Sequence, residues 1–225
     1  MKTFIGGLLS RLKGTGTHAD ASGNAAPPLD PATILYSMPT IAADTLDCEA
    51  PGEAGVAGAP QFHEDAWRQI EFLPGTAVPV LQRMLADFKA FERAHRSASG
   101  WTKIYLRDLQ PVVVIPGDDA VARLAHRLDA TIGPAPTLFT SSQPLGQLKD
   151  GFSIALDTGV VLYGRRSDAG IEALGAMLTA GTDDTALVRV FTILHAMAGL
   201  VLVDWRAQQL LASGDMSTGI EVWRP

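Results

Sequence analysis

The sequence predicts an α+β fold in which a mixed, mostly antiparallel sheet packs against about four helices. Short apolar runs that end at Gly or Pro are typical of strands, and apolar residues at helical spacing predict amphipathic helices. Tight turns between neighbouring runs favour antiparallel pairing. From residue 67 onward the expected order is β, α, β, β, α, β, β, β, α, α, β, whose opening resembles a split β-α-β unit.

The first half of this region is expected to place helices between strands. Side chains alternate over 67–73 before Pro74 and Gly75, which predicts a strand. Apolar residues at i, i+3, i+4, i+7 and i+10 from Leu81 predict a helix over 77–95. The other elements expected here are a strand at 101–109, a strand at 112–115 buried on both faces, and a helix at 118–131.

The second half is expected to contain a hairpin and two helices. A turn at 157–159 separates two apolar runs, which is a hairpin signature. Helices are expected over 167–178 and 183–212. Because 190–203 carries no charge, the last helix is expected to be central and largely buried. Short strands are expected at 138–139 and 220–223.

Composition along the chain predicts three parts. Residues 1–13 form a short basic amphipathic segment, and residues 14–60 form an acidic, Ala/Gly/Pro-rich linker that is expected to be largely disordered. Residues 61–225 form a single globular α+β domain. Whether the apolar island Ile34 to Met38 docks on that domain is left open by the sequence.

Overall composition excludes several classes of protein. The chain has 225 residues, of which 47% are hydrophobic and 19% charged, so it is neither a disordered chain nor a collagen. Its formal net charge of −6 argues against nucleic-acid binding, which requires clustered Lys and Arg. Residues 18–66 carry eight acidic residues and no Lys or Arg, so the acidity belongs mainly to the linker.

The single cysteine, Cys48, cannot form an internal disulfide, which favours the cytoplasm. Acidic neighbours in the sequence raise the pKa of a thiol and argue against a catalytic role. No transmembrane segment is expected, because the longest uncharged stretch is shorter than a spanning helix requires. For residues 1–13, a frayed or self-docked terminus is preferred over peripheral membrane contact or docking on a partner helix.

The most specific candidate ligand site is Arg165, Arg166 and Ser167. Two guanidinium groups stand at the end of a predicted strand, directly before a predicted helix whose free N–H groups favour anions. A phosphate or carboxylate would fit there. The alternative interpretation is a solvated surface turn, since Asp168 competes for the same positive charge.

Other candidate residues have simpler explanations. The stretch around Asp157, Thr158 and Gly159 resembles the catalytic signature of retroviral-type aspartic proteases over about six residues, but that chemistry needs two such loops, and a hairpin turn is preferred. The run His63, Glu64, Asp65 lacks metal-ligand spacing and is expected to be a solvated lead-in. His195 is expected to be a buried neutral imidazole with one hydrogen-bond partner. No metal, cofactor or catalytic residue is predicted.

Two function hypotheses follow. The leading one is a non-catalytic, cytoplasmic protein-binding or regulatory module with an unidentified protein partner, because the titratable residues do not form a recognisable catalytic pattern. The competing one is a small-molecule enzyme or sensor that binds an anionic ligand near Arg165 and Arg166.

Overall fold

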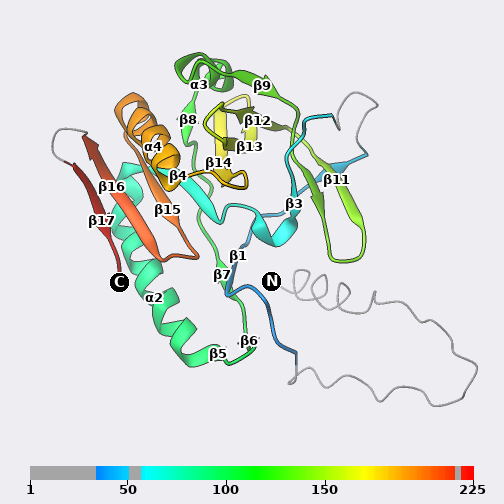
Figure 1. The fold of residues 1–225 in the computed structure, drawn as a ribbon, viewed down its shortest axis with the longest axis vertical. Helices are drawn as coiled ribbons and strands as arrows, with labels where there is room; N and C mark the ends of the chain where they lie inside the picture. Colours follow the sequence, from blue (N-terminus) through cyan, green and yellow to red (C-terminus); the bar gives the residue numbers. More distant parts are fainter. Residues whose placement is uncertain (1–33, 51–56, 216–218) are drawn as a thin grey trace, which may run out of the picture.

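The computed structural model describes residues 34–50, 57–215 and 219–225, and its architecture is dominated by β-strands (Figure 1). These residues form three α-helices and seventeen strands. The prediction of a sheet packed against about four helices is therefore wrong. Two of the predicted helical regions contain strands, for reasons that can be traced to individual residues.

A nine-stranded sheet forms the body of the protein, and every strand pairing in it is antiparallel. Its strand order is β17-β16-β15-β4-β14-β13-β12-β9, with β8 paired to β14. The strands are β4 (Ile70–Pro74), β8 (Ile115–Pro116), β9 (Thr131–Gly133), β12 (Gly151–Ala155), β13 (Val160–Ser167), β14 (Gly170–Leu178), β15 (Leu200–Asp204), β16 (Gln209–Asp215) and β17 (Gly219–Trp223). Strand β4 thus lies in the middle, between β14 and β15.

Helices cover both faces of this sheet. On one face, α3 (Ala120–Arg127) and α4 (Asp184–Ala198) pack on side chains that include Phe72, Leu174 and Leu202. On the other face, α2 (Val78–His95) packs on Leu73, Val201 and Val203. Because side chains alternate along a strand, β4 and β15 contribute to both cores at once.

A small four-stranded sheet covers the rest of the α2 face. It consists of β2 (Cys48–Glu49), β11 (Pro144–Leu148), β10 (Thr137–Phe139) and β3 (Gln61–His63). Its buried residues Phe62, Leu138 and Leu148 pack with Tyr163 of β13. The α2 face therefore has two apolar clusters, one under α2 and one under the small sheet.

The stretch from residue 34 to residue 50, which the sequence places in a linker, forms strands on the surface of the body. Strand β1 (Thr40–Ala42) pairs in parallel with β7 (Tyr105–Arg107), and Tyr36 forms a bridge with Trp101. Trp101 belongs to β6 (Gly100–Trp101), which forms a hairpin with β5 (Arg96–Ser97). Backbone hydrogen bonds from β7 and β6 thus hold a segment that has no apolar periodicity of its own.

The helix predicted over 167–178 is instead the strand β14. Ile171, Leu174 and Leu178 match helical spacing, but β14 lies in the interior of the sheet and is apolar on both faces, so its period is hidden. Only glycine fits at position 175, because a Cβ there would lie 2.6 Å from Cζ of Tyr163 on the neighbouring strand β13.

The helix predicted over 183–212 ends after α4, so it is not one long central helix. Gly199 adopts a left-handed conformation with φ 64°, and its N–H donates to the carbonyl of His195 at 2.7 Å. Such a glycine closes a helix at low conformational cost. The uncharged stretch then continues as the buried strand β15.

The strand predicted at 101–109 is divided between β6 and β7, whereas three other predicted elements are confirmed. The helix over 77–95 is α2, the hairpin around 157–159 joins β12 to β13, and the terminal strand is β17. The strand predicted at 112–115 is misplaced, because Val112 and Val113 are exposed and only the two residues of β8 pair with β14.

Candidate functional site

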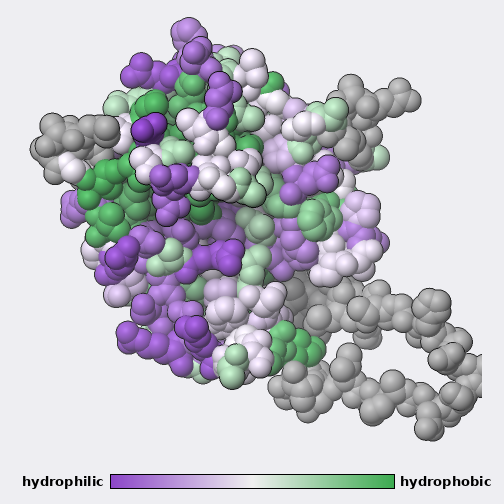
Figure 2. All heavy atoms as spheres, in the orientation of Figure 1, coloured by the Kyte–Doolittle hydropathy of each residue, from purple (hydrophilic) through white to green (hydrophobic). Residues whose placement is uncertain are grey.

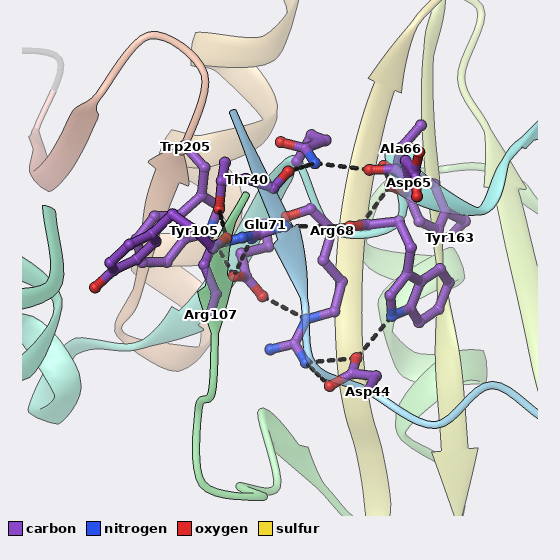
Figure 3. Close-up of polar contacts among 12 residues, drawn as sticks. Thr40, Asp44, Asp65, Ala66, Arg68, Glu71, Tyr105, Arg107, Tyr163 and Trp205 are labelled. Carbon is purple, nitrogen blue, oxygen red and sulfur yellow. Dashed lines mark hydrogen bonds and ion pairs between the residues drawn. The ribbon is translucent and has the colours of Figure 1, made fainter. Parts of the chain in front are cut away.

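Four charged residues, Asp44, Arg68, Glu71 and Arg107, form a buried ionic cluster between the two apolar clusters on the α2 face (Figure 3). They come from the segment before β2, the approach to β4, β4 itself and β7. Buried charges are costly unless each is paired and hydrogen-bonded, so their partners decide what this cluster does.

Glu71 is the centre of the ionic cluster. Its Oε2 accepts from Nε of Arg68 at 2.6 Å, and its Oε1 accepts from Nε1 of Trp205 at 2.6 Å. Nη1 of Arg107 lies 3.4 Å from the same Oε1, and the Arg107 guanidinium carbon lies 5.0 Å from the Trp205 ring centroid. Gly175 is the β14 residue opposite Glu71, so no side chain at that position competes for the space.

Arg68 connects this centre to the N-terminal segment. Its Nη1 donates to both carboxylate oxygens of Asp44, at 2.9 and 2.8 Å, and Trp67 Nε1 donates to the same carboxylate at 2.7 Å. The backbone of Arg68 has φ 55°, which is uncommon for a residue with a side chain. Its carbonyl accepts from Arg107 at 2.7 Å and its N–H donates to Tyr163 at 3.2 Å, which holds that conformation.

Burial and ion pairing act in opposite directions on the pKa values of Asp44 and Arg107. Burial alone would raise the pKa of Asp44, but the charge of Arg68 and the hydrogen bonds from Arg68 and Trp67 hold it below its usual value. Burial lowers the pKa of Arg107 to about 10 even though Glu71 opposes this, so the guanidinium stays protonated at neutral pH. Burial also raises the pKa of Tyr163, which remains a neutral phenol.

The ionic cluster is therefore neutral overall, with two acids and two bases that bind one another. Such a network leaves no free charge for a reacting substrate, but losing one partner strands the others at a cost of about 3–5 kcal/mol. We interpret it as a structural frame that fixes β1, β4, β7 and the β15–β16 turn to one another.

Beside this frame lies a cleft of about 620 Å³, at the start of β4 and the ends of β14 and β15. Apolar and aromatic side chains line much of it, among them Met38, Phe62, Ile70, Trp101, Met177 and Leu178. Residues 37–39 of the N-terminal segment form part of its wall. Figure 2 shows one face of the molecule, with hydrophilic residues gathered in a hollowed area near the middle of the view.

Two acidic residues line the cleft. Glu92, near the end of α2, accepts a hydrogen bond of 2.6 Å from Nε2 of Gln208, and Gln208 belongs to the same β15–β16 turn as Asp204. Asp204 accepts the backbone N–H of Ala207 at 2.8 Å. Burial raises the pKa of Asp204, although the N–H groups of Ala207 and Arg206 oppose the shift.

Several buried polar atoms near the cleft have no hydrogen-bond partner among the described residues. They are Oε1 of Gln69, Oε1 of Gln208 and Nε1 of Trp101. Gln69 and Trp101 both line the cleft. Buried polar atoms are rarely left unpaired, so the walls of this cleft retain hydrogen-bonding capacity.

Arg165, Arg166 and Ser167 lie at the end of β13, and the residues that follow them form the strand β14 instead of the expected helix. Arg165 Nη1 donates to the carbonyl of Thr45 at 3.2 Å, and its Nε lies 3.5 Å from Glu172. Arg166 and Ser167 are exposed. Much of the binding capacity of Arg165 is thus directed at the protein itself.

The remaining candidate residues have local roles. Asp157 lies in the β12–β13 turn, as expected. The Nδ1 atom of His195 lies 2.8 Å from the carbonyl oxygen of Leu200, and this half-buried imidazole stabilises the end of α4. Burial, with the nearby charges of Glu64 and Asp47, raises the pKa of Cys48. The segment 1–13 lies outside the described residues.

His63 lies between Ser141 and Asp65, an arrangement that superficially matches a serine nucleophile with its base. Its Nε2 is 3.2 Å from the Ser141 hydroxyl, and Nδ1 is 3.4 Å from the Asp65 carboxylate. The Nδ1 atom, however, accepts the backbone N–H of Asp65 at 3.2 Å, which caps the short helix η2 (Glu64–Ala66). When Nδ1 accepts this N–H, the ring proton lies on Nε2 and His63 donates to Ser141, an arrangement that caps η2 and does not activate the hydroxyl.

Metal-ligand clusters and membrane-spanning helices are both absent among the residues that the structure describes. No group of three or more His, Cys, Asp or Glu side chains there is placed to hold a metal ion. In the same ranges, no helix is long and apolar enough to cross a membrane.

Comparison with known proteins gives no relative. No protein-family model, no curated protein and no solved structure matches the chain.

Sequence reasoning missed both the ionic cluster and the cleft. One usable signal was present, since Arg68 and Glu71 interrupt the otherwise apolar run of Trp67, Phe72 and Leu73. A charge inside a buried strand predicts an ionic partner elsewhere. Nothing in the sequence identifies Asp44 as that partner, because it lies in a stretch without periodicity.

Proposed function

We propose that this protein is a non-catalytic binding module whose ligand site is the cleft at the start of β4. The supporting observation is the form of the cleft: its volume of about 620 Å³ falls in the range of roughly 300–1,000 Å³ typical of small-molecule sites. Its walls are largely apolar and aromatic with a few polar groups, which is the usual composition of such sites.

The neighbouring ionic cluster supports this proposal because it makes the base of the cleft rigid. Tyr163 lines the cleft, and its hydroxyl accepts the N–H of Arg68 and donates to the carbonyl of Ala66 at 3.4 Å. Gln69 lines it as well, with its amide nitrogen bound to the carbonyls of Thr40 and Asp65. A ligand would meet side chains that are already held in place, which reduces the entropy lost on binding.

The position of the N-terminal segment favours a regulatory role. Residues 37–39 form part of the cleft wall, yet the segment is held by the short strand β1 and by Asp44. A ligand that contacts this wall stabilises the docked segment by mass action. A protein partner that recognises the segment would then respond to the ligand. The cytoplasm remains the proposed location, because Cys48 has no second cysteine to pair with.

A thermal-shift screen of the full chain against a library of small organic molecules tests the proposal. Ala207 is exposed and lines the cleft, so Ala207→Trp is expected to fill it without disturbing the core. Ala198→Trp, at the exposed end of α4, is the matched control. We expect compounds that raise the melting temperature of the parent and of the control but not of Ala207→Trp. Compounds that stabilise all three proteins equally would overturn the cleft as the site.

A further inference from the structure

The charges around the cleft indicate which kind of ligand it selects, an inference that rests on the proposed function. Glu92 and Asp204 both line the cleft, and the turn that follows Asp204 carries Gln208, which donates to Glu92. The hydrogen bond from the neutral Gln208 amide leaves the charge of Glu92 uncompensated. Asp204 accepts backbone N–H groups, which are neutral, and the charge of Arg206 offsets part of its own. Two carboxylates against one guanidinium still leave the lining negatively charged. The cleft therefore attracts a cation.

The unpaired polar atoms near the cleft also favour a ligand that donates hydrogen bonds. Two of the three buried unpaired atoms near the cleft are acceptors, Oε1 of Gln69 and Oε1 of Gln208. Among the lining residues themselves, the acceptors are Oε1 of Gln69 and the carboxylates of Glu92 and Asp204, and the unpaired buried donor is Nε1 of Trp101. A ligand rich in N–H donors fits this set better than one rich in acceptors.

The aromatic and apolar side chains of the walls indicate a second property of the ligand, an apolar body. Trp101 lines the cleft and lies in the hairpin directly after α2, the helix that carries Glu92. An aromatic ring beside carboxylates is the combination that binds organic ammonium groups, because the ring face also attracts a cation. Met177 and Leu178 provide apolar surface for the remainder of such a ligand.

We propose that the cleft selects an organic ammonium ion attached to an apolar body. Arg206 is the one cationic side chain among the lining residues, and it is exposed. A free amine is repelled slightly by this guanidinium. An apolar amino acid presents the same ammonium group and a carboxylate that Arg206 can bind. These are two sources of one ligand chemistry, and the test separates them.

Four probes of similar shape differ in charge: 2-phenylethylamine, phenylalanine, 2-phenylethanol and 3-phenylpropionate. Their binding to the full chain is measured by NMR titration of the Trp101 indole N–H, assigned with Trp101→Phe. We expect 2-phenylethylamine or phenylalanine to bind about fivefold or more tightly than the neutral alcohol, and the propionate to bind most weakly.

Variants assign the effect to the two carboxylates. Glu92→Gln and Asp204→Asn are each expected to weaken binding of 2-phenylethylamine several-fold and to leave binding of 2-phenylethanol unchanged. Asp87→Asn is the matched control, since Asp87 is exposed on the same helix and does not line the cleft. If an amino acid is the natural ligand, Arg206→Gln should weaken the binding of phenylalanine and strengthen the binding of 2-phenylethylamine.

Equal binding of the amine and the alcohol, or amine binding that survives both carboxylate variants, overturns the ammonium class while the cleft remains a ligand site. No binding by any of the four probes also overturns it. The proposed function fails separately, when no compound distinguishes the parent from Ala207→Trp.

Discussion

Asp44 and Arg68 are 24 residues apart and are joined by hydrogen bonds of 2.9 and 2.8 Å from one guanidinium nitrogen to both carboxylate oxygens. This contact fastens the N-terminal segment to the approach of the central strand β4. Because residues 37–39 of that segment form a wall of the cleft, the same contact also determines the shape of the candidate site.

Replacing Asp44 tests this connection. Asp44→Ala leaves the buried Arg68 with one fewer carboxylate, and we expect the free energy of unfolding to fall by about 2 kcal/mol or more. Asp47→Ala is the control, since Asp47 is exposed and lies in the same segment. Denaturant unfolding measures both. Equal stability of the two variants would show that the Asp44 contact is dispensable.

The same residue predicts a response to acid. Because the folded-state pKa of Asp44 lies below its usual value, its contribution to stability is fully present above the unfolded value of about 3.9. This contribution is lost as the pH falls through the folded-state pKa. The difference in stability between the parent and Asp44→Asn should therefore narrow below about pH 4, and a difference that stays constant down to pH 2 would contradict it.

Truncation tests whether residues 34–50 belong to the folded body. A chain of residues 34–225 is expected to melt at a higher temperature than a chain of residues 51–225, which lacks β1, β2 and Asp44. Differential scanning calorimetry compares them. Identical melting temperatures would instead support a domain that begins near residue 61.

Asp204 is expected to reduce stability in the free protein. Its folded-state pKa is raised by burial, so the ionised form is disfavoured in the folded state, and the penalty is present above the folded-state pKa. Asp204→Asn should raise the free energy of unfolding at pH 7, and this gain should disappear below about pH 4, where the parent is protonated in both states. Asp157→Asn, in an exposed turn, serves as control. A destabilised Asn variant at pH 7 would contradict the assignment.

The close packing between Gly175 and Tyr163 can be tested by making one substitution at Gly175 in two backgrounds, with and without the Tyr163 ring. Gly175→Ala places a Cβ 2.6 Å from the phenol ring and is expected to cost about 1–3 kcal/mol. In a Tyr163→Ala background, where the ring is absent, the same change should cost much less. Equal costs in the two backgrounds would indicate strain in the backbone rather than this contact.

The sequence predicted those elements in which one periodicity is clear. Helix α2 has a single apolar stripe, and the turn at 157–159 has a residue pattern that hairpins select. The prediction for β14 was wrong because a strand buried on both faces shows no alternation. The helix α4 was predicted to be too long because a glycine within an apolar stretch can either continue or end a helix. Gly199 ends the helix, although the apolar stretch around it continues into β15.

The candidate site could not be predicted, because it depends on contacts between distant parts of the chain. Glu71 and Trp205 are 134 residues apart, and Glu92 is joined to Gln208 across 116 residues. Local spacing carries no information on such pairs. The one site that local spacing did suggest, at Arg165 and Arg166, relied on a helix after Ser167 that is the strand β14.

The most direct test of the central claim is to map by NMR where the best compound of the thermal-shift screen binds to the parent protein. We expect shifts of backbone amides to gather at 37–39, 69–70, 176–178 and 204–207, together with a shift of the Trp101 indole N–H. Shifts that gather instead at Arg165, Arg166 and Ser167, or that leave these segments unchanged, would contradict it.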